Sequence, residues 1–98
     1  MDMHTYRNVW DAIASTPVEA ENLKLRSQLM MTLEQYIVRE GITQEEAAQR
    51  LGVSRPRVSD LVRGHIDKFT IDKLVNMAAR VGLTATLTVK RERKRKAA

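Results

Sequence analysis

Cysteine is absent from this sequence of 98 residues. Its absence excludes disulfide bonds and thiolate metal sites, and it makes a reducing cytoplasm the natural compartment. Long hydrophobic runs are missing as well. The first 30 residues contain no apolar run of signal-peptide length, and no stretch approaches the ~20 apolar residues that span a bilayer. We therefore expect a cytoplasmic protein that has no membrane partner.

Aromatic residues are scarce, with one tryptophan, two tyrosines and one phenylalanine. Because so few large rings are available, the core must be filled mainly by Leu, Ile, Val, Met and Ala. A length of 98 residues and a hydrophobic content of 43% fit one small domain. We divide the chain into an N-terminal helical segment over residues 1–17, a main domain over 18–89 and a tail over 90–98.

Excess basic charge is confined to one end of the chain. The formal net charge is +5, and the stretch from Lys90 to Lys96 contains six basic residues and one acidic residue. Residues 1–89 carry 11 basic and 11 acidic side chains, so their charges balance. We expect the tail to be disordered, and it either adds sequence-independent affinity for phosphates or keeps the chain soluble. Because the excess charge belongs to the tail, the overall basicity is weak evidence for a nucleic-acid-binding fold. Such evidence must come from where individual arginines lie.

Apolar residues recur at helical spacing through most of the main domain. The pattern predicts one long helix over 18–40, closed by Gly41, and three short helices after it. Thr43 is a predicted N-cap with Glu46 three residues on, and together they form a capping box. The short helices are expected over 44–51, from Ser54 to about Arg63, and from Thr70 to about Arg80.

Two of these helices have the spacing of a helix-turn-helix. Helices that cross steeply need a small residue where they touch, and Ala48 supplies it. The sharp turn between them favours a left-handed residue, and Gly52 adopts that conformation without a Cβ clash. Four apolar positions then face the interior, namely Leu51, Val53, Val58 and Leu61. The outer face of the second helix is left to enter a DNA major groove, unless the pair serves packing alone.

After Gly82 the period changes from helical to two. Leu83, Ala85, Leu87 and Val89 alternate with polar residues, which predicts a β-strand. A single strand after four helices has no partner within its own chain and would leave an open edge. We expect antiparallel pairing with the same strand of a second chain, which gives a two-fold homodimer. The alternative is a frayed, extended end.

The motif residues resemble those of a known family. Thr43 to Ala48, followed by Gly52-Val53-Ser54, resembles the Cro/C1-type helix-turn-helix repressors. A longer set is similar to one branch of that family, the HigA-like antitoxins, and its members are Arg55 to Leu61, Gly64, Phe69 and Leu74. The resemblance covers roughly residues 8–90. It implies a mainly α fold, a helical bundle of about five helices with a helix-turn-helix, plus one C-terminal β-strand that pairs across a dimer.

The resemblance also implies a function. Proteins of this kind are sequence-specific transcriptional repressors that bind a palindromic operator in double-stranded DNA as dimers, autoregulate their operon and bind a toxin protein. The alternative is a stand-alone phage- or host-type regulator with no toxin partner. A stripe at helical spacing in the N-terminal segment either packs on its own bundle or docks the toxin, since Trp and Tyr are favoured anchors. Its members are Tyr6, Val9, Trp10 and Ile13.

The family positions translate into candidate DNA contacts. The residue that opens the first motif helix contacts a phosphate in family repressors; here it is Gln44, which could equally be a solvated cap. Base-reading positions fall on Arg55, Pro56 and Asp60, with Ser59 alongside and the cap Ser54 next to them. Asp60 either accepts from cytosine or pairs with a neighbouring arginine. Further cations are placed to meet phosphates or remain solvated, namely Arg57, Arg63, His65 and Lys68.

A catalytic function is not expected from this sequence. It contains no Ser/His/Asp set, phosphate loop or metal cluster, and a chain of this length offers little room for a deep pocket. The two histidines, His4 and His65, are isolated and lack metal-ligand partners at useful spacing. We therefore assign no enzyme activity, metal or cofactor.

Overall fold

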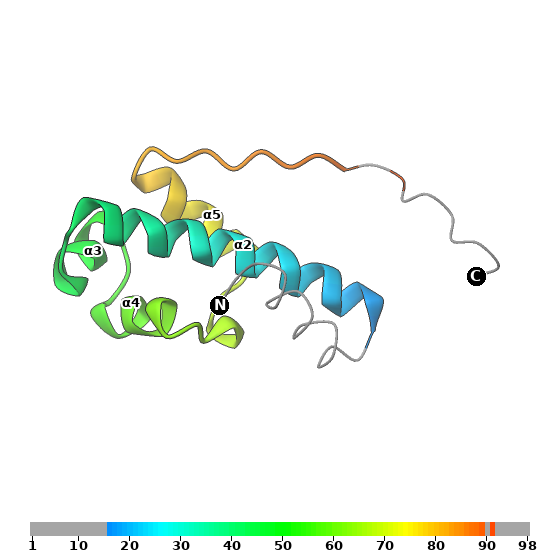
Figure 1. Ribbon diagram of the computed structural model, residues 1–98, viewed down its shortest axis with the longest axis horizontal. Coiled ribbons are helices and arrows are strands. Elements are labelled where there is room, and N and C mark those ends of the chain that lie inside the picture. Colours follow the sequence, from blue (N-terminus) through cyan, green and yellow to red (C-terminus); the bar gives the residue numbers. More distant parts are fainter. Residues whose placement is uncertain (1–15, 90, 92–98) are drawn as a thin grey trace.

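The computed structural model describes residues 16–89 and residue 91. In this part of the chain there are four α-helices and one short 3₁₀-helix, arranged as Figure 1 shows. The elements are α2 (Pro17–Glu40), α3 (Gln44–Leu51), α4 (Arg55–Val62), η1 (Ile66–Lys68) and α5 (Ile71–Arg80). The mainly helical fold is confirmed, but a fifth α-helix is not found among the described residues. The stripe of Tyr6, Val9, Trp10 and Ile13 and the basic tail apart from Arg91 lie outside them.

Each described α-helix begins after a hydroxyl side chain. The hydroxyl oxygen accepts a hydrogen bond from the N–H three residues later and so satisfies one donor that a helix start leaves free. The four caps are Thr16, Thr43, Ser54 and Thr70. The capping box predicted at Thr43 is only half formed. The Glu46 N–H donates to Thr43 Oγ1 at 3.1 Å, but the Glu46 carboxylate accepts from Arg50 at 3.0 Å instead of returning to the cap.

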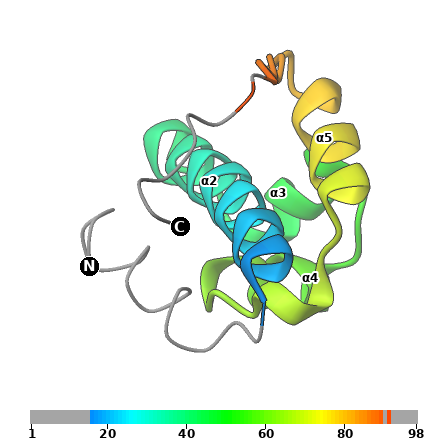
Figure 2. The same ribbon diagram turned by 90° about the vertical axis from the view of Figure 1, so that its right-hand side faces the viewer.

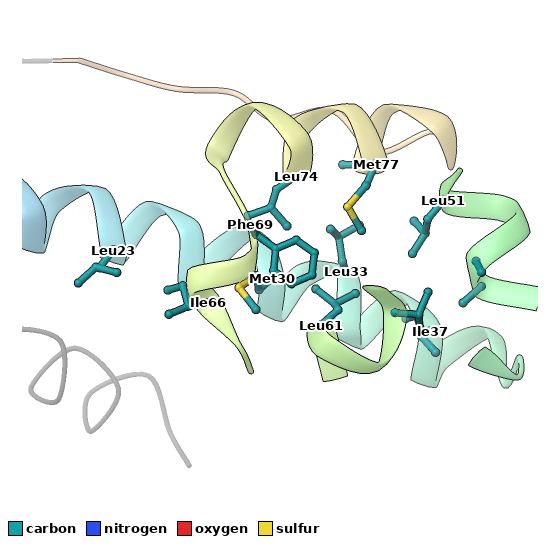
Figure 3. Close-up of a cluster of buried hydrophobic side chains, with 14 residues drawn as sticks. Leu23, Met30, Leu33, Ile37, Leu51, Leu61, Ile66, Phe69, Leu74 and Met77 are labelled. Carbon is teal, nitrogen blue, oxygen red and sulfur yellow. The ribbon is translucent and has the colours of Figure 1, made fainter. Parts of the chain in front are cut away.

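The core lies between the long helix α2 and the three shorter helices. Leu33 of α2, Val58 of α4 and Leu74 of α5 are completely buried. Figure 3 shows how Leu33 and Leu74 converge with Phe69, which is the only aromatic residue in the core that the described residues form. The prediction of a mostly aliphatic core is therefore confirmed.

Arg26 ties the segment after α4 to α2. Its Nη1 donates to the carbonyl oxygens of Ile66 and Phe69 at 3.1 and 3.2 Å, and its Nε donates to Asn22 Oδ1 at 2.6 Å. Charge-assisted hydrogen bonds of this kind are stronger than neutral ones. Because one carbonyl belongs to the first residue of the 3₁₀-helix and the other to the residue just after it, Arg26 holds η1 against α2. This contact fixes the path of the chain after α4.

The strand predicted over residues 83–89 is not formed. The segment is extended, but a strand needs ladder hydrogen bonds to a neighbour, and none is found in the described part of this single chain. Leu83 is half-buried, and its N–H donates to the Ala78 carbonyl oxygen at 2.9 Å. Ala85 is exposed, Leu87 is 66% exposed and Val89 is 83% exposed, so these side chains do not cover the bundle. Figure 1 shows the segment in orange, running beyond α5.

Candidate nucleic-acid interface

The α3–α4 pair forms a tight corner. Ala47 is completely buried and Ala48 is 8% exposed, so no large side chain separates the two helices. Gly52 follows α3 with φ of 74°, in the left-handed region that the sequence predicted for it. The N–H groups of Gly52 and Val53 both donate to the Ala48 carbonyl oxygen, at 2.9 and 3.1 Å. These contacts turn the chain sharply between α3 and α4.

The corner divides α4 into an inner and an outer face. Val58 and Leu61 are buried, as predicted, and Val53 just before the helix is half-buried. By contrast, Ser54, Arg55 and Pro56 are all exposed. The start of α4 is therefore presented to solvent, while its apolar face anchors the helix to the core.

The charge at the start of α4 differs from that of its neighbours. α2, α3 and α5 each have an acidic residue in the first turn, but α4 has none. It has Arg55 and Arg57 there instead. Cations at the positive end of a helix dipole cost roughly 0.3–1 kcal/mol each at low ionic strength. Such a cost is typical of a position selected to meet an anion and not to stabilise the helix.

Asp60 joins two of the predicted contact residues to each other. Its Oδ2 accepts from Arg57 Nη1 at 3.4 Å, and its Oδ1 lies 3.0 Å from His65 Nδ1. The same Arg57 nitrogen donates to the Lys68 carbonyl oxygen at 3.4 Å, and the guanidinium lies 5.8 Å from the centre of the Phe69 ring. Arg57, Asp60, His65 and Lys68 thus form one connected group. Since Asp60 is engaged on both oxygens, the geometry favours pairing with its neighbours over reading cytosine.

The other predicted residues lie outside this connected group. Among the described residues no hydrogen bond or ion pair engages the side chain of Arg55, which leaves its guanidinium free to meet a ligand. Arg63, which caps the end of α4, is also exposed. Ser59 and Gln44 are half-buried, and Gln44 is the first residue of α3. The structure therefore brings four predicted residues together, Arg57, Asp60, His65 and Lys68. It leaves Arg55, Gln44 and Arg63 apart from that group.

Arg50 is a structural centre that sequence reasoning missed. Its Nη1 donates to the Tyr36 hydroxyl and to Glu40 Oε1, both at 3.1 Å, and its Nη2 donates to Glu46 Oε2 at 3.0 Å. The bond to Tyr36, followed by those to Glu40 and Glu46, raises the pKa of Arg50. Arg50 thereby ties α3 to the end of α2. The i,i+4 spacing from Glu46 signals one of these pairs, but the two partners on α2 depend on the tertiary fold.

No metal site is found among residues 16–89 and 91, because they contain no group of three or more potential ligands. In the same part of the chain, no helix combines the length and the apolar character needed to span a bilayer. The arrangement offers exposed polar and basic side chains on a helix whose other face is anchored in the core, which is suited to binding.

A corner of two short helices with one exposed helix face defines the helix-turn-helix class. The chain belongs to the helix-turn-helix domain family, whose model matches residues 14–90. A solved chain whose name provisionally places it in the XRE family of transcriptional regulators is similar, with a TM-score of 0.71 and 25% identity. That similarity covers 82% of this chain and 90% of the other. No curated protein matches. The class predicted from Ala48 and Gly52 is confirmed, and the antitoxin branch stays a prediction.

The corner predicts a cost for any side chain at Gly52. We expect Gly52→Ala to lower the free energy of unfolding by about 1–2 kcal/mol, because an L-residue is strained in the left-handed region. An added Cβ would also displace the Arg80 side chain, which lies against Gly52. Urea denaturation measures the change, and Gln49→Ala on the exposed face of α3 is the control, expected within about 0.5 kcal/mol of the parent. Equal midpoints for Gly52→Ala and the parent would contradict this account of the turn.

Proposed function

We propose that this protein is a sequence-specific DNA-binding regulator of transcription that inserts α4 into the major groove. The observation that carries the proposal is the exposure of Ser54, Arg55 and Pro56 at the start of a helix whose other face is fixed in the core. An α-helix fits the major groove, where each base pair displays a distinct set of donors and acceptors. Family membership and the likeness to a chain named as an XRE regulator support the same conclusion.

The proposed contacts fall into two kinds. Arg55 donates to the O6 and N7 edge of guanine, and Pro56, which has no N–H, makes an apolar contact such as one to a thymine methyl. Ser54 and Ser59 flank them. Gln44, Arg63, His65 and Lys68 meet phosphates, which fix the register of the protein on the duplex. We assign Asp60 to holding Arg57 and His65 in position, because both of its oxygens are engaged by them.

We propose a homodimer that pairs two copies of residues 83–89. An apolar hollow of about 380 Å³ lies between α2, α5 and this segment, lined in part by Leu29, Val75 and Leu87. Val75 of α5 is 37% exposed. Antiparallel pairing with Leu83, Ala85, Leu87 and Val89 of a second chain would satisfy the open backbone and cover the hollow. Two recognition helices would then face two half-sites of a palindromic operator about one helical turn apart.

A narrower proposal is that the regulator is an autoregulating repressor and the antitoxin of a toxin–antitoxin pair. The likeness of residues 55–61 to HigA-like antitoxins supports it, together with Gly64 in the left-handed region and the buried Phe69 and Leu74. The toxin would dock on the stripe of Tyr6, Val9, Trp10 and Ile13. A stand-alone phage- or host-type regulator is the alternative within the same class.

Removal of the Arg55 guanidinium tests the DNA-binding proposal. The probe is a duplex recovered by repeated selection from a randomised pool, with a scrambled duplex as competitor. We expect Arg55→Ala to weaken binding to the selected duplex by ~1–3 kcal/mol in a fluorescence anisotropy titration, because a base contact is lost. Arg39→Ala, an exposed arginine at the end of α2, is the control and should bind as the parent does. Equal affinity of Arg55→Ala and the parent would refute this role for α4.

Truncation tests the dimer. A chain that ends at Gly82 lacks the proposed pairing segment and should sediment as a monomer in analytical ultracentrifugation, because the exposed edge is removed. A chain that ends at Val89 keeps the segment, loses only the tail and should remain dimeric. A dimer that persists in the shorter chain would place the interface elsewhere.

Co-expression tests the antitoxin proposal. We expect the tagged protein to retain the product of the adjacent gene, and Trp10→Ala to release it, because buried aromatic anchors dominate most interfaces. Val18→Ala, a change of a highly exposed apolar residue at the start of α2, is the control. An adjacent product that never co-purifies with the parent chain would favour the stand-alone regulator.

A further inference from the structure

A basic hollow lies between the α3–α4 turn and α5. Its volume is about 390 Å³, and Leu51, Val53 and Met77 form part of its apolar wall. Its polar lining contains three cations and two side chains that can donate hydrogen bonds, and it contains no carboxylate. The polar residues are Ser54, Arg57, Lys73, Asn76 and Arg80.

We propose that this hollow binds a phosphate group, and that in the regulator–DNA complex this is a backbone phosphate beside the N-terminal end of α4. The proposal rests on the proposed function for its DNA source. The two candidate ligands, a DNA backbone phosphate and inorganic phosphate, share the chemistry of a phosphate oxyanion. Lys73, Asn76 and Arg80 belong to no motif that sequence reasoning identified, so the site adds three residues to the interface.

The spacing on α5 brings these residues to one side. Lys73, Asn76 and Arg80 stand at i, i+3 and i+7, which places them on the same face of a helix. All three are exposed, although they line the hollow. In the view of Figure 2 the chain between α3 and α4 passes beside α5, so this face of α5 meets the turn that leads into the recognition helix.

Two of the three charges that line the hollow are not neutralised from within the described chain. Arg57 is paired with Asp60, but Lys73 and Arg80 have no ion pair among residues 16–89 and 91. Cations that share one hollow repel each other, and an anion placed between them converts that repulsion into attraction. Ser54 and Asn76 add neutral groups that can hydrogen-bond to phosphate oxygens. A bound phosphate would therefore supply a partner of opposite charge for Lys73 and Arg80 and acceptors for Ser54 and Asn76.

The place of the hollow in the fold favours DNA as the source. Ser54 caps α4 and also lines the hollow, so the bound phosphate would lie next to the residue that precedes Arg55. Arg63 and His65 lie at the other end of α4. With eight residues, α4 is ~12 Å long, about the width of the major groove. A phosphate contact at each end would hold the helix between the two backbones.

The test is the salt dependence of DNA binding by a double variant. Lys73→Gln with Arg80→Gln removes two cations from the hollow, and Lys24→Gln with Arg39→Gln removes two from α2 as the matched control. The probe is the selected duplex. We expect the slope of log K against log[KCl] to fall in magnitude by about 1 in the first variant, since one lost phosphate contact removes about 0.9. Affinity should fall about tenfold or more, equally for selected and scrambled duplexes.

The outcomes separate this site from the proposed function. Suppose that the parent binds the selected duplex more tightly than the scrambled one. If the Lys73→Gln/Arg80→Gln variant then has the same slope and affinity as the control variant, the phosphate site is overturned and the proposed function is not. A parent that does not discriminate contradicts sequence-specific recognition. In that case inorganic phosphate decides the site. Phosphate stabilises any folded chain to some extent relative to chloride, so the readout is the difference between two chains: at equal ionic strength the melting temperature of the parent should rise by more than that of the Lys73→Gln/Arg80→Gln variant. An equal rise in the two chains would then overturn the proposal.

Discussion

The structure depends on the close crossing of α3 and α4. Buried Ala47 and Ala48 allow the helices to approach, and Gly52 turns the chain in a left-handed conformation that larger residues avoid. Because of this corner, Val58 and Leu61 reach the core while Arg55 and Pro56 point outward. The long helix α2 supports the corner at two places, through Arg50 at the end of α3 and through Arg26 at the segment after α4. The exposed start of α4 is thus held on a rigid base.

Electrostatics at this exposed end oppose helix stability and favour an anionic partner. The first turn of α4 has two arginines where the other described α-helices have acids, and two further cations from α5 line the adjoining hollow. Asp60 pairs with Arg57 and His65 and does not reach these two cations. Local violations of helix preference are expected where a ligand supplies the missing stabilisation. DNA, with its regular array of phosphates, is the ligand that fits both the charges and the shape of the helix.

Local patterns predicted the parts of this fold that local interactions determine. Hydroxyl caps at Thr43, Ser54 and Thr70 and the glycine at 52 marked the helix ends, because capping involves residues only a few positions apart. The tertiary contacts of Arg26 and Arg50 were not predictable, since their partners lie on other elements. The half-formed capping box has the same origin: Arg50 competes for the Glu46 carboxylate. Residues 83–89 have the alternation of a strand, but alternation cannot supply the neighbouring chain that a ladder requires. The basic hollow was missed because its residues come from separate segments.

The most direct test of the central claim is to ask which groove of the DNA the protein covers. Methylation by dimethyl sulfate modifies guanine N7 in the major groove and adenine N3 in the minor groove. If α4 lies in the major groove with Arg55 on guanine, the bound protein should protect guanine N7 at two positions about one helical turn apart. Protection confined to adenine N3, or no protected guanine on a duplex that the protein binds specifically, would contradict the assignment of α4 as the recognition helix.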